Sequence, residues 1–171
     1  MDFVDPPRDL AREGLVMILR ENQGVCTWAV RLDGSEDPPV VVEVDSWPNP
    51  VWVSCADRFS TFMFCWLWDF CFGPLDLRGR HSLLECQAGQ LAPEAIAQLQ
   101  AHFQEMPRTH GWPGKTNYRF SGHGGKILIW AGEERGTDWH VAASSKDMGG
   151  VTAKLRALGI SLEGAYVIDN P

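Results

Sequence analysis

The segment most informative about the fold is residues 15–32, L-V-M-I-L-R-E-N-Q-G-V-C-T-W-A-V-R-L. Two apolar runs, 15–19 and 25–32, lie on either side of a polar segment that contains Asn and Gly. Apolar, β-branched runs around such a segment are typical of two strands and a turn, and Gly24 suits the turn because glycine tolerates positive φ. The pattern predicts a β-hairpin.

The same pattern continues on the C-terminal side of the hairpin. Asp33-Gly34 and Asp37-Pro38-Pro39 have the composition of turns, and residues 40–44 and 51–53 are rich in valine. Short strands joined by turns are typical of antiparallel sheets in which consecutive strands pair. We therefore predict an antiparallel meander over residues 15–53.

The segment 57–72, D-R-F-S-T-F-M-F-C-W-L-W-D-F-C-F, fits two patterns. Aromatic residues at every even position from 62 to 72 would suit a strand, whereas apolar residues at 59, 62, 63, 66 and 70 have helical spacing. Because the segment is long for a strand, we predict a helix capped by Asp57 and apolar around most of its circumference. Packing in the core is its expected role, and an aromatic box for a ligand is the alternative.

The C-terminal half of the chain alternates between helical and strand patterns. Ala92-Pro93 opens a helix that extends to Met106, and Gly159 closes a second helix over 151–158. Strands are predicted at 118–121, 126–131, 139–144 and 165–168. The expected fold is a single α+β domain over residues 1–171, mainly antiparallel sheet with helices packed on one face.

Acidic residues outnumber basic ones by 22 to 15, which gives a net charge of −7. Six acidic and no basic side chains lie between Leu32 and Arg58, namely Asp33, Glu36, Asp37, Glu43, Asp45 and Asp57. An acidic face repels nucleic acid and suits a basic partner, and its simplest role is to keep the protein in solution. We expect no nucleic-acid partner.

The cysteine pattern and the N-terminal sequence indicate a cytoplasmic protein. The five cysteines are odd in number, and several lie in apolar runs, which is typical of reduced, buried thiols. The N-terminal residues lack the apolar run of a signal peptide, and no apolar run is long enough to span a membrane. We therefore expect no membrane partner.

Motifs of catalysis and metal binding are missing from the sequence. The cysteines and histidines do not have the spacing of a zinc site, and Gly114-Lys115-Thr116 lacks the first glycine of a phosphate-binding loop, since Thr109 stands there. No Gly-x-Ser-x-Gly motif occurs. The sequence predicts no catalytic residue, no metal and no cofactor.

Two motifs at a fixed spacing resemble the SUKH superfamily, which includes bacterial immunity proteins and the yeast cell-wall assembly regulator. Members carry an E-N-Q-G stretch and a following Trp on a hairpin, and then a D-P-P-V element ahead of a strand. The matching positions are Glu21, Asn22, Gln23, Gly24, Trp28, Asp37, Pro38, Pro39 and Val40. We expect these residues mainly to fix turns and core. The very aromatic 59–72 stretch departs from the family and suggests a further packing partner, such as a second copy of the chain.

The resemblance implies binding rather than catalysis: an antidote that binds a toxin domain, often a nuclease, in the producing cell. A basic nuclease surface would be attracted to the acidic block. The candidate partner-binding residues are Asp33, Glu36, Asp37, Glu43 and Asp45, with Trp47 and Trp52 as aromatic anchors. A regulatory or scaffold domain of the same fold is one alternative. A small-molecule binder or enzyme with a cleft near the hairpin is another.

Overall fold

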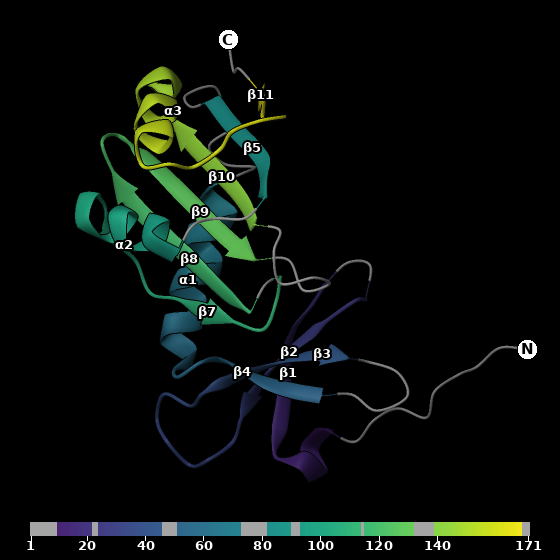
Figure 1. Cartoon of the computed structure of the whole chain (residues 1–171). Helices are drawn as coiled ribbons and strands as arrows, with labels where there is room; N and C mark the ends of the chain where they lie inside the picture. Colours follow the sequence, from purple (N-terminus) through teal and green to yellow (C-terminus); the bar gives the residue numbers. More distant parts are fainter. Residues whose placement is uncertain are drawn as a thin grey trace, which may run out of the picture. The chain divides into compact units, whose positions relative to one another are not determined.

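The computed structural model describes residues 10–21, 24–45, 51–72, 82–89, 93–113, 115–131 and 139–168. Its helices and antiparallel sheets confirm the predicted α+β class (Figure 1). The chain divides into two compact units, Met1–Phe62 (unit 1) and Met63–Pro171 (unit 2). The prediction of one domain over residues 1–171 stays a prediction.

Unit 1 contains a four-stranded antiparallel sheet in which each strand pairs with the next along the chain. A short 3-10 helix, Leu10–Glu13, precedes it. The strands are β1 (Leu15–Arg20), β2 (Thr27–Arg31), β3 (Val40–Asp45) and β4 (Val51–Ala56). The hairpin and the meander that the valine-rich runs predicted are therefore confirmed.

Strand register places apolar side chains on both faces of this sheet. Trp28 pairs with Val42, which is fully buried, and the Trp28 ring lies 6.4 Å from the ring of Phe62. On the opposite face, Ala29 and Val41 form a small core with Leu15. A strand that is buried on both faces loses its apolar–polar alternation, which explains the continuous apolar runs in the sequence.

Unit 2 contains a seven-stranded antiparallel sheet (Figure 1). Its spatial order is β11-β5-β10-β9-β8-β6, and β7 also pairs with β8. The strands are β5 (Ser82–Gly89), β6 (Gln104–Glu105), β7 (Thr109–His110), β8 (Thr116–Gly122), β9 (Gly125–Ala131), β10 (Trp139–Ser145) and β11 (Tyr166–Ile168). The sequence pattern missed β5, which lies between β11 and β10.

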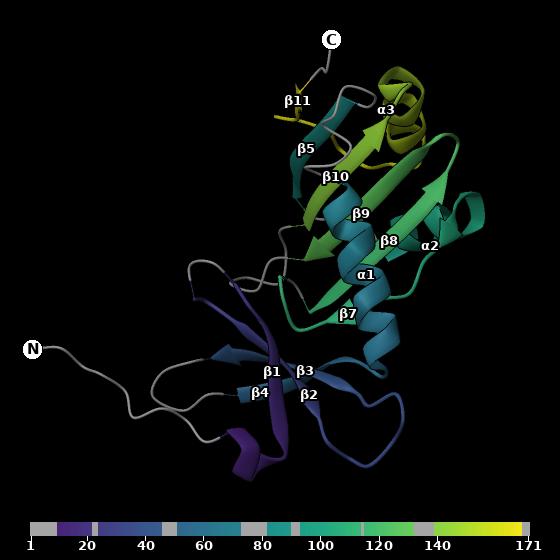
Figure 2. The same cartoon turned by 180° about the vertical axis from the view of Figure 1, so that it is seen from behind.

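Helices cover both faces of the unit 2 sheet. α2 (Pro93–His102) and α3 (Met148–Ala157) pack on one face, where Leu99 and Leu155 join Phe120, Ile127 and other apolar side chains in one core. α1 (Phe59–Phe72), whose residues from Met63 onward belong to unit 2, lies on the other face (Figure 2). The predicted packing of helices on one face therefore holds for α2 and α3, and it is wrong for α1.

The start of α1 is fixed by a residue distant in sequence. The Asp37 carboxylate accepts a hydrogen bond of 2.8 Å from the Ser60 amide and one of 2.6 Å from the Ser60 hydroxyl. These bonds satisfy a donor in the first turn, which otherwise lacks an intrahelical partner. Asp37 thus takes the capping role that the sequence suggested for Asp57. The helix itself was predicted correctly.

Candidate functional site

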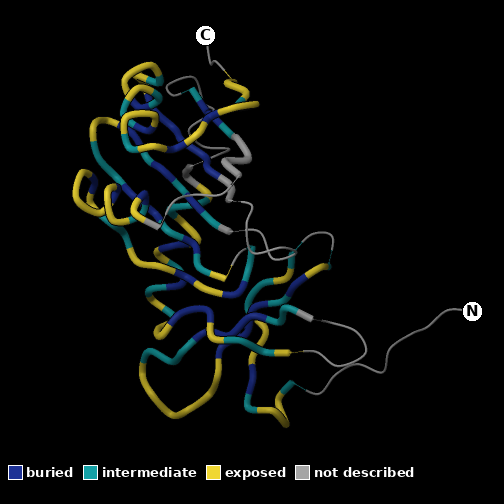
Figure 3. Tube along the Cα trace, viewed as in Figure 1, coloured by how far each residue is buried: buried dark blue, intermediate teal, exposed yellow. Residues whose placement is uncertain are grey.

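The predicted acidic residues fall into three structural classes. Asp33 and Glu36 lie on the connection between β2 and β3, in which residues 32–36 are exposed (yellow in Figure 3). Asp37 is half-buried and caps α1. Glu43 is half-buried in β3, and Asp45 ends that strand with its side chain outside the described residues. Among the described residues, the exposed connection and Asp57 are therefore the parts of the acidic block that face solvent.

Hydrogen bonds hold two of these carboxylates in their charged form. The amide and hydroxyl of Ser35 donate to Asp33 at 2.9 and 2.6 Å and lower its pKa. The two bonds from Ser60 lower the pKa of Asp37 in the same way. Both side chains therefore keep their negative charge well into the acidic range.

The predicted aromatic anchors are not presented together. Trp52 is half-buried and packs against the core of Leu15, Ala29 and Val41. It pairs across the strands with Glu43, so the two side chains share a face of the sheet. Trp47 lies outside the described residues. In the structure, Trp52 contributes to the core of unit 1, and an anchoring role stays a prediction.

Gly24 and Trp28, two of the motif residues that the structure describes, lie in a turn and in the core respectively. Gly24 has a φ of 76°, and its amide donates to the carbonyl of Glu21 at 2.9 Å. Trp28 is buried. Pro38 and Pro39 are half-buried, and the Pro39 carbonyl accepts from the Arg31 amide at 2.9 Å. Asn22 and Gln23 lie outside the described residues.

A polar cluster lies between α1 and the unit 2 sheet. Arg119 of β8 is buried, and its guanidinium donates to Asp69 of α1 in a bidentate pair at 2.7 and 2.5 Å. The same guanidinium contacts the hydroxyl of Thr109 at 3.1 Å. Asn117, also buried, donates to the Trp112 carbonyl at 3.0 Å. The bonds to Asp69 hold α1 against β8, a structural role that the sequence did not reveal.

The outward side of α1 carries large apolar side chains. Phe64, Trp66, Leu67 and Phe70 are exposed large hydrophobic residues, and the rings of Trp66 and Phe70 stack at 5.6 Å. The buried Cys65 and the half-buried Trp68 and Asp69 lie on the inward side. The sequence showed that this helix is apolar nearly all round, but it did not show which side is covered.

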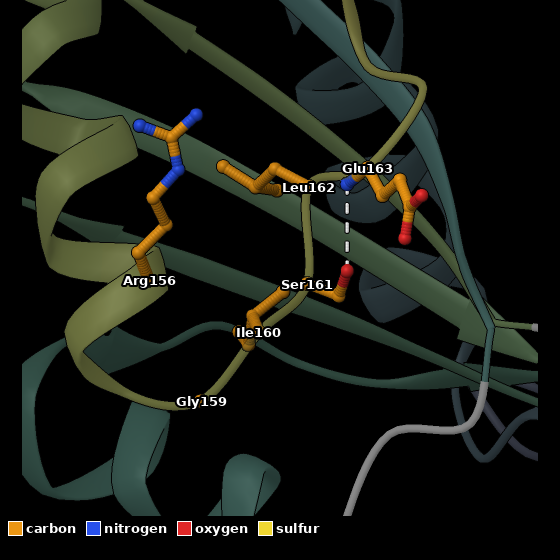
Figure 4. A pocket seen from close by; sticks show the side chains of 6 residues that line it. All are labelled: Arg156, Gly159, Ile160, Ser161, Leu162 and Glu163. Carbon is orange, nitrogen blue, oxygen red and sulfur yellow. Dashed lines mark hydrogen bonds between the residues drawn. The ribbon is translucent and has the colours of Figure 1, made fainter.

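A shallow hollow of about 450 Å³ lies at the C-terminal end of α3 (Figure 4). Arg156 and Glu163 lie on either side of Leu162, and the Glu163 amide donates to the Ser161 hydroxyl at 3.4 Å. Gly159 and Ile160 complete the lining. One cation and one anion beside an open surface do not converge on a point, so the hollow contains no arrangement for acid–base or nucleophilic chemistry.

Among the described residues, no three His, Cys, Asp or Glu side chains are placed to hold a metal ion. Cys65 is buried, its thiol donates to the Pro107 carbonyl at 3.4 Å, and burial raises its pKa. A thiol with a raised pKa is a poor nucleophile. None of the described helices has the length and hydropathy needed to cross a bilayer.

Comparison with models of protein families, with curated proteins and with solved structures gives no match. The resemblance to the SUKH superfamily therefore stays a prediction that depends on the motif residues between 17 and 53.

Proposed function

We propose that this chain is an immunity protein, which binds a toxin domain in the producing cell and blocks it by protein–protein contact. The observation that carries the proposal is the distribution of charge. Unit 1 contains 11 acidic and 5 basic side chains, a net charge of −6 out of −7 for the chain, in little more than a third of its length. The exposed β2–β3 connection contributes Asp33 and Glu36 to this charge.

Such a surface suits one class of partner in particular. A nuclease domain binds the phosphates of its substrate with basic side chains, so the face that contains its active site is positively charged. An acidic inhibitor is drawn to that face during diffusion, and it competes there with the nucleic-acid substrate. The SUKH-like motifs of unit 1 support the same function, since the family includes immunity proteins. A basic nuclease is therefore the toxin class that we favour.

Co-expression tests this function. The full chain is expressed together with the C-terminal domain of a toxin encoded by a neighbouring gene, and cell survival and co-purification are both scored. We expect survival together with a stable complex. Death of the cells despite folded protein would contradict the function for that toxin. Survival without a complex would contradict inhibition by binding and point to removal of the toxin's substrate or product.

Charge reversal on the exposed connection tests the acidic surface separately. We predict that Asp33→Lys/Glu36→Lys slows association with the toxin domain by about tenfold at low salt, because electrostatic steering is lost. A matched control is Glu94→Lys/Glu163→Lys, which changes the net charge equally at exposed sites of unit 2. Stopped-flow association rates should fall for the first variant only. Equal rates for both variants would show that unit 1 does not guide binding.

A further inference from the structure

The outward side of α1 has the properties of a buried surface, although it is exposed. The exposed fractions are 45% for Phe64, 37% for Trp66, 50% for Leu67 and 45% for Phe70. At about 200 Å² for each large side chain, these four residues expose roughly 350 Å² of apolar surface. A patch of that size on a monomer often marks a binding site.

The polarity of α1 is reversed relative to that of an ordinary surface helix. A surface helix buries its apolar stripe and exposes charged side chains. In α1, Asp69 is the one charged residue among the 14, and its carboxylate is bound to the buried Arg119. The side facing away from the sheet carries Phe64, Leu67 and Phe70. Its sequence therefore matches a helix that is covered on both sides.

We propose that a second copy of this chain covers this side of α1, in a two-fold symmetric dimer in which α1 packs against α1. Charge favours a second copy over other occupants. The repulsion between two chains of net charge −7 is weakest where uncharged surfaces meet, and the four exposed side chains of α1 carry no charge. A basic partner would gain no attraction here, and an anionic lipid surface would repel the chain.

The area of the patch fits an interface of this kind. A two-fold interface uses the same patch on both subunits, so two copies contribute roughly 700 Å² of apolar surface. A specific interface buries at least about 1,000 Å² in total, and about 65% of a homodimer interface is apolar, which requires about 650 Å². Complete burial of the four side chains on both copies would therefore supply the apolar part of a dimer interface at the lower limit of this size range.

The helix surface also has the shape that helix packing requires. Trp66 and Phe70, four residues apart, stack at 5.6 Å and form one ridge. Met63 and Leu67 have the same spacing and form the neighbouring ridge. Ridges of this spacing on one helix pack into the grooves of another, so the α1 surface can pack against its own copy.

Sedimentation velocity of the full chain at concentrations up to ~100 µM tests the proposal, since a dimer of micromolar affinity is mostly formed there. We expect a dimer for the wild type. Leu67→Glu should weaken dimerisation at least tenfold, because it places charge in the apolar contact. The matched control is Val167→Glu, a substitution of the same charge at a residue that is 44% exposed on β11. The control should dimerise as the wild type does.

A wild type that stays monomeric at the highest concentration would overturn the proposal, and so would equal dimerisation of the wild type and Leu67→Glu. A monomeric wild type that binds phosphatidylcholine vesicles would also overturn it, because a lipid surface and not a second copy would then cover α1. Circular dichroism checks that the variants are folded. If Leu67→Glu does not fold, Phe70→Ser provides the same comparison without adding charge. Its unweakened dimerisation would equally overturn the proposal.

Discussion

The two faces of the unit 2 sheet are held to their helices by different kinds of contact. Under α2 and α3, the sheet presents Phe120, Ile127 and Ile129, all fully buried in one apolar core. Under α1, the same strands present Arg119 and Lys126 beside apolar residues. Arg119 is paired with Asp69 of α1, and the Lys126 ammonium lies 5.3 Å from the centre of the Trp68 ring. The face under α2 and α3 is covered through apolar contacts, and the face under α1 is covered through polar contacts as well.

This difference explains the unusual sequence of α1. A helix that makes polar contacts with its sheet must satisfy charge on the inside, which α1 does with Asp69. Of its aromatic side chains, Trp68 packs against the sheet, and Phe64, Trp66 and Phe70 are exposed. The aromatic residues of α1 therefore have two roles: some complete the contact with the sheet, and the others form the proposed contact with a second copy.

The largest effect on stability is expected on the face under α2 and α3. Phe120→Ala should lower the free energy of unfolding by about 4 kcal/mol, because it removes a fully buried ring and leaves a cavity. Phe64→Ala is the matched control, since it makes the same chemical change on the exposed side of α1. Below the concentration at which dimers form, it should cost less than about 1 kcal/mol. Equal losses in urea denaturation would contradict the assignment of buried and exposed sides.

An intermediate effect on stability is expected on the face under α1. Asp69→Ala should cost about 2 kcal/mol, because it leaves the guanidinium of Arg119 buried without its carboxylate. The figure is below that of a fully buried pair because the Asp69 side chain is 35% exposed. Asp69→Leu/Arg119→Met should recover most of the loss, since it removes both charges. A double variant no more stable than Asp69→Ala would show that the pair itself is not the cause.

The smallest effect is a dependence on pH at the start of α1. The pKa of Asp37 is held below its ordinary value of 3.8 by the hydrogen bonds from Ser60. A carboxyl with a lowered folded pKa stabilises the fold above the unfolded value and loses that contribution as pH falls through the folded pKa. Asp37→Asn should therefore lower Tm near neutral pH, and the difference from the wild type should shrink below pH 3.8.

Asp57→Asn serves as the control for this measurement, because Asp57 is exposed at the same end of the helix. We expect the control to keep the wild-type Tm near neutral pH. A difference between wild type and Asp37→Asn that stays constant down to strongly acidic pH would show that the hydrogen bonds, and not the charge, provide the stabilisation.

Local sequence patterns predicted the elements that depend on local physics. Valine-rich runs between turn residues predicted the unit 1 meander, and helical spacing correctly outweighed the alternation of aromatic residues in α1. β5 was missed because both of its faces are covered: Leu83 and Leu84 are adjacent and both buried, so no alternation remains.

Contacts between distant residues could not be predicted in this way. Asp37 caps a helix that begins 22 positions further on, and Arg119 pairs with a carboxylate 50 residues away. A pattern also shows that a helix is apolar without showing which side the sheet covers. For the same reason, the acidic block could be recognised from sequence, but its division into exposed, capping and half-buried carboxylates required the fold.

Hydroxyl-radical footprinting tests in one measurement whether the outward side of α1 is exposed in the monomer and whether a second copy of the chain covers it. The full chain is labelled at ~1 µM and at ~100 µM, and oxidation of individual side chains is measured by mass spectrometry. We predict that Phe64, Trp66, Leu67 and Phe70 are labelled at the low concentration and protected severalfold at the high one. Met17 and Tyr166, which are exposed elsewhere, should be labelled equally at both. Equal labelling of the four α1 residues at both concentrations would contradict a second copy on this surface.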